Sequence, residues 1–446
     1  MFLKLKEISI KKLFGIFDHD IKLNNDRGIT IIIGENGLGK TKILEMVEAF
    51  FKGEFYKLTN VEYESLLFKF EDNVSWEVSK NNSQEKEVSL SINQKEKEKE
   101  EEVFLIELDV YTPEAIRREA AHIVRMSNTL RRISNDTWQH RYNGELYNSL
   151  EIVEKFGVNS SKAFGNNFIK DLDLPQWFIS RFERVQVSLI ETQRVYNFEN
   201  PDRAPIETVK KYSRELTELI KRKLTESTEL SSKLDRTYPN RLVNELKKGN
   251  RNVSEENLKD ELNALEDKRS LLDEVGLVET DKNSDLLLID EPENTVKNVL
   301  MLYVKDSFDK LSIFDEIAEK IRLLLKIINE RFKHKKLFVN KEEGFVFKST
   351  VLKEAGIFKK IPLEQLSSGE KNELILFYNL IFNTTPNSLI LIDEPEISLH
   401  ISWQNKFISD LKEIHNLNKL DILIATHSPD IISNNWDLRV ELQGVE

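Results

Sequence analysis

Two groups of residues, far apart in the chain, have the types needed to bind and hydrolyse a triphosphate. The first is Gly34–Thr41, which reads Gly-Glu-Asn-Gly-Leu-Gly-Lys-Thr and matches the phosphate-binding pattern G-x-x-x-x-G-K-[ST]. Glycines let phosphate oxygens approach backbone N–H groups without an intervening side chain. Three residues would line this cradle: Asn36, Gly37 and Gly39. Lys40 would reach the β- and γ-phosphates of ATP, and the Thr41 hydroxyl would bind Mg²⁺.

The second group is a pair of carboxylates, Asp393 and Glu394, at the end of the apolar run Leu389–Ile392. The carboxyl ends of strands are where α/β sheets bind ligands. We expect Asp393 to hold Mg²⁺ and Glu394 to orient or deprotonate the attacking water. A nearly identical run ends in Asp290 and Glu291, but no motif of the same site flanks it. We therefore interpret that copy as a solvated turn before a helix.

The surrounding patterns predict the elements that position these groups. The run Ile29–Ile33 is continuously apolar, which is typical of a buried parallel strand, and a helix follows from about Thr41. Alternating apolar and polar residues between 55 and 110 predict an antiparallel β subdomain. From 111 to 180 the pattern is mostly helical.

A helical arm is predicted in the second half of the chain. Residues 206–275 are rich in Glu, Lys and Leu at helical spacing, with a turn-like Tyr238-Pro239-Asn240 near the middle. A second apolar stripe at helical spacing runs from about 295 to 333. Together these segments predict a hairpin-like helical insertion.

Composition excludes several classes of function. The 446 residues are enough for two or three domains. The net charge of -12 argues against a protein that coats DNA generally, although a local basic groove is compatible with it. The chain has no cysteine, which excludes disulfides and Cys-bound metals and fits a reducing cytosol. We find no signal peptide and no apolar run of the roughly 18 residues that span a membrane, so we expect a cytoplasmic protein without a membrane partner.

A third motif points to a family. Leu366-Ser367-Ser368-Gly369-Glu370 precedes the acidic strand and resembles the LSGGQ signature of ABC, SMC and RecF-like ATPases. By itself Ser-x-x-Glu is equally typical of a helix N-terminal cap. The order of the motifs favours this family. The resemblance implies an α/β fold with an ABC-type P-loop ATPase head. The resemblance further implies that Ser367 and Gly369 of one subunit complete the ATP site of another, so that the chain acts as a homodimer or a higher homo-oligomer.

Two more residues are assigned by this resemblance. Gln193 follows the predicted strand Val185–Ile190 and takes the place of the family's Gln loop, which senses Mg²⁺ and water. His427, in Ala-Thr-His-Ser-Pro, resembles the switch histidine that contacts the γ-phosphate. Without the resemblance, the two would read as a surface glutamine and a structural histidine.

The resemblance also implies a domain organisation. Residues 1–110 would form the N-terminal lobe of the head with its β subdomain, and 111–200 a helical region ending in the Gln-loop strand. Residues 201–335 would form the inserted, short coiled-coil-like arm, and 336–446 the C-terminal lobe with signature, acidic strand and switch histidine. Few residues follow His427, so we expect no nuclease domain of the kind found in the overcoming-lysogenization-defect ATPases.

The motif set is most similar to the PtuA family of ATPases from Septu antiphage defence systems. That likeness implies that ATP hydrolysis regulates a separate nuclease subunit of HNH type. Two alternatives share much of the set: an ATPase sensor of a PARIS-type system with a TOPRIM effector, and a RecF- or SMC-like DNA-repair ATPase that binds DNA. A scaffold or transport ATPase is less compatible with the large helical insertion.

Overall fold

The computed structural model describes residues 2–82, 88–96, 101–107, 113–126, 129–134, 136–141, 144, 146–156, 174–190, 196–197, 206–247, 254–279, 293–397 and 399–444. The chain divides into two compact units. The first contains Met1–Thr208 and Ile375–Glu446, and the second contains Val209–Leu374. Each is described by itself.

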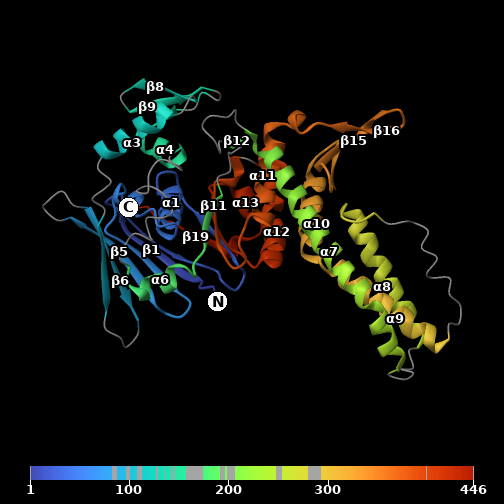
Figure 1. The fold of residues 1–446 in the computed structure, drawn as a ribbon. Helices are drawn as coiled ribbons and strands as arrows, with labels where there is room; N and C mark the ends of the chain where they lie inside the picture. Colours follow the sequence, from blue (N-terminus) through green and yellow to red (C-terminus); the bar gives the residue numbers. More distant parts are fainter. Residues whose placement is uncertain are drawn as a thin grey trace. The chain divides into compact units, whose positions relative to one another are not determined.

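A five-stranded parallel sheet forms the centre of the first unit (Figure 1). In spatial order its strands are β11 (Val187–Ile190), β17 (Leu389–Asp393), β18 (Asp421–Ala425), β3 (Ile29–Ile33) and β19 (Arg439–Glu441). The three central strands are almost wholly apolar and buried, because helices cover a parallel sheet on both faces. Three helices follow strands of this sheet: α1 (Lys40–Phe51), α12 (Ile401–Asn418) and α13 (Pro429–Ile432).

The first unit also contains an antiparallel sheet of six strands, as the alternating pattern predicted. Its strands, in spatial order, are β2 (Phe17–Lys22), β1 (Leu5–Leu13), β4 (Ser65–Phe70), β5 (Ser75–Asn82), β6 (Val88–Lys95) and β7 (Glu102–Glu107). Phe50 of α1 packs on Phe68 of β4, with ring centroids 4.7 Å apart, and on Phe178 of α6 (Gln176–Phe182). This aromatic core joins the P-loop helix to the β subdomain.

The segment after β7 is less helical than its sequence suggests. It contains α3 (Pro113–Met126) and α4 (Ser149–Phe156), but between them lies a three-stranded sheet. The strands are β8 (Leu130–Ser134), β9 (Thr137–His140) and β10 (Leu146–Tyr147). They share a small core with the two helices, around Trp138 and Ile152. The expectation of a mostly helical region thus missed this small sheet, because strands this short leave no clear alternation in the sequence.

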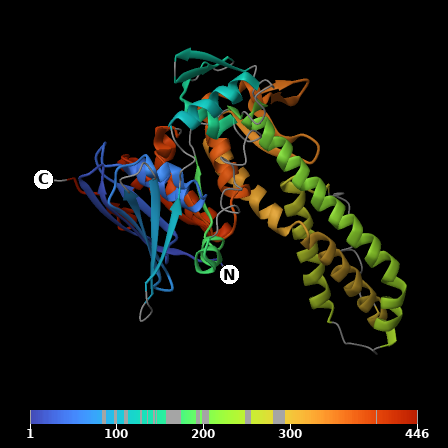
Figure 2. The same cartoon turned by 60° about the vertical axis from the view of Figure 1, so that its left-hand side comes forward.

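Helices dominate the second unit (Figure 2). They are α7 (Thr208–Lys247), α8 (Glu255–Glu274), α9 (Asn294–Ser312) and α10 (Asp315–Arg331). Leucines of α8 pack on Val304 and its neighbours in α9. The inserted helical arm of the fold prediction is thus confirmed.

The expected turn at Pro239 is absent, because α7 continues through this proline as one helix of 40 residues. A proline removes one backbone hydrogen bond and usually bends or ends a helix. Arg241 lies close to this point. Its guanidinium donates to the carbonyl of Leu234 at 2.9 Å and to Asp306 of α9 at 2.7 Å. Tertiary contacts of this kind outweigh the local preference.

A three-stranded antiparallel sheet completes the second unit. It consists of β14 (Lys335–Asn340), β15 (Gly344–Glu354) and β16 (Ile357–Ile361), and β15 and β16 form a hairpin (Figure 1). Helix α11 (Ser368–Phe382) follows and crosses into the first unit. The compact units thus divide at 208 and 374, whereas the predicted C-terminal lobe began at 336.

Candidate nucleotide-binding site

The P-loop is the turn between β3 and α1. Gly37 and Gly39 have φ angles of 91° and 87°, a region that favours glycine. A Cβ on Gly39 would lie 2.5 Å from the Leu13 side chain, so only glycine fits there. The Lys40 ammonium lies inside this loop and donates to the carbonyls of Gly34 at 2.8 Å and Glu35 at 3.0 Å. The loop therefore has the tight curvature and the buried cation that phosphate binding requires.

His19 supports the loop from the neighbouring β subdomain. It lies on β2, is 2% exposed, and its Nε2 is 2.9 Å from the carbonyl oxygen of Leu38. Because that oxygen can only accept, Nε2 carries the proton in this contact. Burial lowers the pKa of His19, and the bond to Leu38 opposes this effect. His19 belongs to no motif, so its role could not be predicted from the sequence.

The strand order brings the predicted site residues to one edge of the sheet. Strand β18 lies between β3 and β17, and Ala425 pairs with both Ile32 and Asp393. Parallel strands in this register end at the same level. Just beyond, the Glu394 N–H donates to the carbonyl of Ala425 at 2.9 Å. The P-loop, the acidic pair and the segment of His427 therefore begin side by side.

Thr41 and Asp393 are neighbours, since the Thr41 side chain acts on the Asp393 carboxyl and lowers its pKa. Burial raises the pKa of Asp393 above its ordinary value. The polar side chain of Thr41 opposes the increase in this pKa, while the charges of Glu394, Glu45 and Glu396 add to it. A divalent cation would relieve this concentration of negative charge.

Mg²⁺ fits this donor set. It is a hard cation that takes oxygen ligands, and it commonly uses only one or two protein groups together with phosphate oxygens and water. The Thr41 hydroxyl and the Asp393 carboxylate supply two such oxygens. Within the described ranges no group of three or more His, Cys, Asp or Glu could hold a metal by itself, so the nucleotide would have to supply further ligands.

Glu394 and His427 form the other side of the site. Glu394 has a φ of 42°, which is uncommon for a residue with a side chain and marks a strained position. Its Oε1 lies 3.6 Å from Nδ1 of His427. The Glu394 and His427 side chains remain 28% and 48% exposed. Both can therefore be reached by a ligand in front of the P-loop edge.

Glu396 orients His427, although no motif in the sequence marks this glutamate. Its carboxylate is 8% exposed and lies 3.2 Å from Nδ1 of His427. The same Oε1 accepts hydrogen bonds from the Thr426 hydroxyl at 2.7 Å and from the His427 backbone N–H at 3.0 Å. Glu396 thus fixes both the backbone and the ring of His427. With a proton on Nδ1 facing Glu396, the Nε2 of His427 can face a ligand.

The segment predicted to be the signature, Leu366–Glu370, lies in the second unit and leads into α11. Ser367 accepts from the Glu370 N–H at 3.3 Å, and the Glu370 carboxylate accepts from the Ser367 N–H at 2.9 Å and from its hydroxyl at 3.0 Å. This is a capping box. Lys335 of β14 pairs with Glu370 at 2.9 Å. Ser367 and Gly369 are exposed, and a Cβ on Gly369 would meet nothing within 4 Å, so backbone at this helix start is open to a ligand from outside.

Sequence comparison assigns the chain to a family. A family model described as an AAA ATPase domain matches residues 3–432. The chain belongs to the AAA ATPase domain family. This AAA ATPase domain therefore fills nearly the whole chain, including the P-loop and the acidic pair. No curated protein matches the chain in sequence.

Three solved structures are similar to this AAA ATPase domain. An SMC head bound to the C-winged helix domain of ScpA has 11% identity and a TM-score of 0.32, covering 96% of this chain and 91% of that one. The SMC head domain from Thermotoga maritima has 10% identity and a TM-score of 0.32, covering 99% of both chains. The recombination mediator protein RecF with ATP has 11% identity and a TM-score of 0.29, covering 100% of this chain and 98% of that one.

Some predicted features of the AAA ATPase domain fall outside the part that the structure describes. Gln193 is one of them, and the alternative acidic pair, Asp290 and Glu291, is another. The assigned roles of the other site residues remain predictions, although the structure brings Lys40, Thr41 and Asp393 together. Within the described segments, no helix is both long and apolar enough to span a bilayer.

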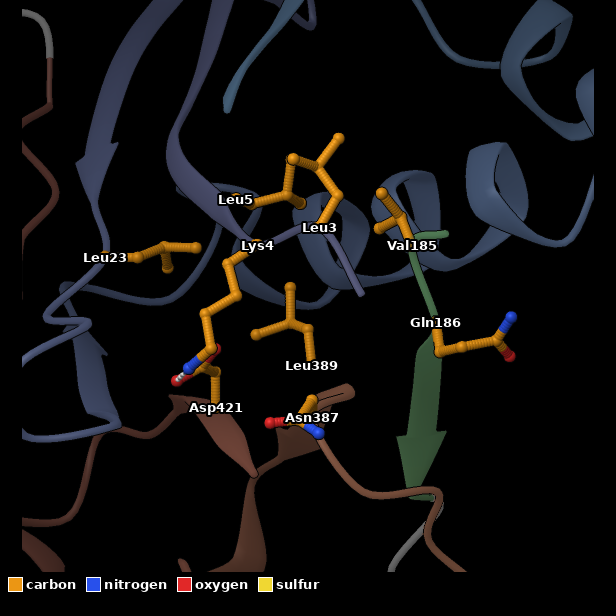
Figure 3. A pocket seen from close by; sticks show the side chains of 9 residues that line it. All are labelled: Leu3, Lys4, Leu5, Leu23, Val185, Gln186, Asn387, Leu389 and Asp421. Atoms are coloured by element: carbon orange, nitrogen blue, oxygen red, sulfur yellow. Dashed lines mark hydrogen bonds and ion pairs between the residues drawn. The ribbon is translucent and has the colours of Figure 1, made fainter. Parts of the chain in front are cut away.

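A small hollow lies at the other end of the central sheet, where β17 and β18 begin (Figure 3). Lys4 and Asp421 face each other in it, with Nζ 2.8 Å from Oδ2. This ion pair joins the N-terminal segment of the AAA ATPase domain to β18. The hollow is thus a structural junction, distant from the P-loop edge of the sheet.

Proposed function

We propose that the protein binds Mg-ATP between two copies of itself and hydrolyses it there. The observation that carries this proposal is the strand order β17-β18-β3, in which Ala425 pairs with both Ile32 and Asp393, so that the phosphate cradle and the acidic strand end at one edge of the sheet. The exposed start of α11 supports the second half of the proposal. Ser367 and Gly369 of one protomer would close the γ-phosphate side of the other protomer's P-loop.

Each side chain has a defined task in this mechanism. Lys40 would hold the β- and γ-phosphates, and Thr41 and Asp393 would hold Mg²⁺, which would supply positive charge to the phosphate oxygens. Glu394 positions and deprotonates the attacking water. His427, oriented by Glu396, stabilises charge that develops on the γ-phosphate. Gln193 would assist at the metal and the water.

A complementation experiment tests the shared site. Lys40→Ala removes the phosphate cradle, and Ser367→Arg blocks the signature, so neither variant alone should hydrolyse ATP. When equal amounts of the two variants pair at random, half of the dimers contain one protomer of each variant. In such a dimer one of the two sites is intact, because it combines the P-loop of the Ser367→Arg protomer with the signature of the Lys40→Ala protomer. Turnover should therefore recover to about a quarter of the wild-type rate. Thermal unfolding establishes that both variants are folded. If they are, a mixture as inactive as its components would contradict a shared site.

We further propose that this ATP cycle regulates a separate nuclease of HNH type in bacterial antiphage defence. The motif set of PtuA-like ATPases supports this role. A TOPRIM effector of a PARIS-type system and a RecF-like role in DNA repair are the alternatives. The deciding experiment is to express the protein with the products of its neighbouring genes and to purify the complex. A nuclease that copurifies, and whose DNA cleavage changes in Glu394→Gln, supports regulation, whereas recovery with replication proteins supports repair.

A further inference from the structure

The outer face of the sheet β14–β15–β16 carries a row of lysines. Lys336 pairs with Lys348 across β14 and β15, and Lys348 pairs with Lys360 across β15 and β16. Residues directly opposite in antiparallel strands point to the same face. Neighbouring strands lie about 4.8 Å apart, so the three residues, here called the lysine row, form a line across the sheet.

Phenylalanines lie between these lysines. The ammonium groups of Lys336 and Lys348 lie 5.6 and 5.1 Å from the ring centre of Phe338, which places all three on one face. At the hairpin, Lys353 lies 4.8 Å from the ring centre of Phe358. The two rings are 37% and 43% exposed. The surface therefore alternates cations with aromatic rings that solvent can reach.

Little negative charge balances this face. The segment 335–361 contains seven lysines and three glutamates in a chain whose net charge is -12. Lys360 pairs with Glu343, but for Lys336, Lys348 and Lys353 the described residues provide no ion pair. Like charges directly opposite each other destabilise a sheet. The arrangement is therefore unfavourable by itself, and an anionic ligand would relieve the repulsion.

We propose that this face binds single-stranded nucleic acid. The lysine row would contact successive phosphates, and the exposed rings of Phe338 and Phe358 would stack on bases. In a duplex the bases are already stacked on one another, so the aromatic rings favour a single strand. An acidic protein would satisfy the lysines but would leave the rings without matched partners. None of the residues assigned to the ATP site lies on this face, so the proposal does not depend on the shared ATP site.

The test is a titration of a fluorescein-labelled 20-mer of deoxythymidine with the full-length protein, followed by anisotropy at several salt concentrations. We expect saturable binding that weakens linearly in a plot of log K against log salt. The Lys336→Gln/Lys348→Gln variant should bind at least about tenfold more weakly. The magnitude of its salt slope should fall by about 1.4, the value expected for the loss of two phosphate contacts on a single strand. Phe338→Leu should weaken binding about tenfold and leave the slope unchanged, because stacking releases no counterions.

Lys233→Gln/Lys247→Gln is the matched control, since it removes two exposed lysines of α7 and changes the net charge equally. It should bind like the wild type. Equal losses in both double variants would show a general charge effect and overturn the proposal. The proposal would also be overturned if the 20-mer did not bind, or if a duplex of the same length bound more tightly. Complete displacement of the 20-mer by poly-glutamate of equal total charge would overturn it as well. Thermal unfolding of each variant establishes that it is folded.

Discussion

Replacing Glu396 by glutamine probes how the His427 segment is held. In the native protein, Oε1 of Glu396 accepts two hydrogen bonds and lies 3.2 Å from Nδ1 of His427. Its other oxygen, Oε2, is buried and has no hydrogen-bond partner among the described residues. In Glu396→Gln, an amide N–H₂ would take that position without an acceptor.

The magnitude follows from these contacts. Hydrogen bonds to a charged group contribute about 1 kcal/mol more than neutral ones, so two weakened bonds cost about 2 kcal/mol. A buried amide without an acceptor adds about 1–3 kcal/mol. We therefore expect Glu396→Gln to lower the free energy of unfolding by about 3–5 kcal/mol. If His427 loses its orientation, kcat should fall about ten- to hundredfold, which corresponds to roughly 1.4–2.7 kcal/mol in the barrier.

Urea unfolding and steady-state ATP turnover measure these two effects, and Glu441→Gln is a control at an exposed glutamate. A double-mutant cycle with His427→Gln separates them. Residues in contact usually show a coupling of about 0.5–3 kcal/mol. If the losses of Glu396→Gln and His427→Gln in turnover are simply additive, Glu396 does not act through His427, and the reasoning fails.

Three further outcomes are expected. Glu394→Gln should bind ATP, hydrolyse it at least about a hundredfold more slowly, and accumulate as an associated form in size-exclusion chromatography. The pKa of His19 is below its ordinary 6.5 in the folded protein, so the unfolded chain binds the proton more readily. Stability should therefore fall as the pH drops below 6.5, and His19→Gln should flatten this pH dependence in thermal melts. Arg331→Met should lower the unfolding free energy by about 3–5 kcal/mol, since it breaks the buried 2.6 Å pair with Glu373, and Arg331→Met/Glu373→Leu should recover most of that loss in urea unfolding.

Each of these outcomes can be contradicted. Wild-type turnover in Glu394→Gln would remove this residue from catalysis. Parallel pH profiles of wild type and His19→Gln would assign the acid sensitivity to other groups. A double variant as unstable as Arg331→Met alone would mean that the lost stability comes from packing and not from an uncompensated charge.

The sequence predicted most of the fold that surrounds the nucleotide. The P-loop and the acidic strand were predictable because each is a local pattern, and strand ends in a parallel sheet meet at one edge. The β subdomain and the helical arm followed from periodicity, and both are present.

The remaining features depend on contacts between distant segments. Glu396 looks like an ordinary turn residue, and only the return of β18 beside it buries the carboxylate. His19 lies on an alternating strand like its neighbours until the P-loop carbonyl of Leu38 is placed against it. Pro239 locally indicates a turn, but packing of α7 keeps the helix continuous. Such features cannot be predicted from spacing, because the decisive partner is set by the tertiary fold.

The capping box at the start of α11 has a consequence for nucleotide discrimination. The Ser367 hydroxyl has a single proton, and it donates that proton to Glu370. In the proposed dimer, a γ-phosphate oxygen would have to replace the glutamate as acceptor, so sealing the site exchanges one charge-assisted hydrogen bond for another. ADP offers no oxygen at that position. Ser367 would then return to Glu370, and release of phosphate would by itself favour separation of the two protomers.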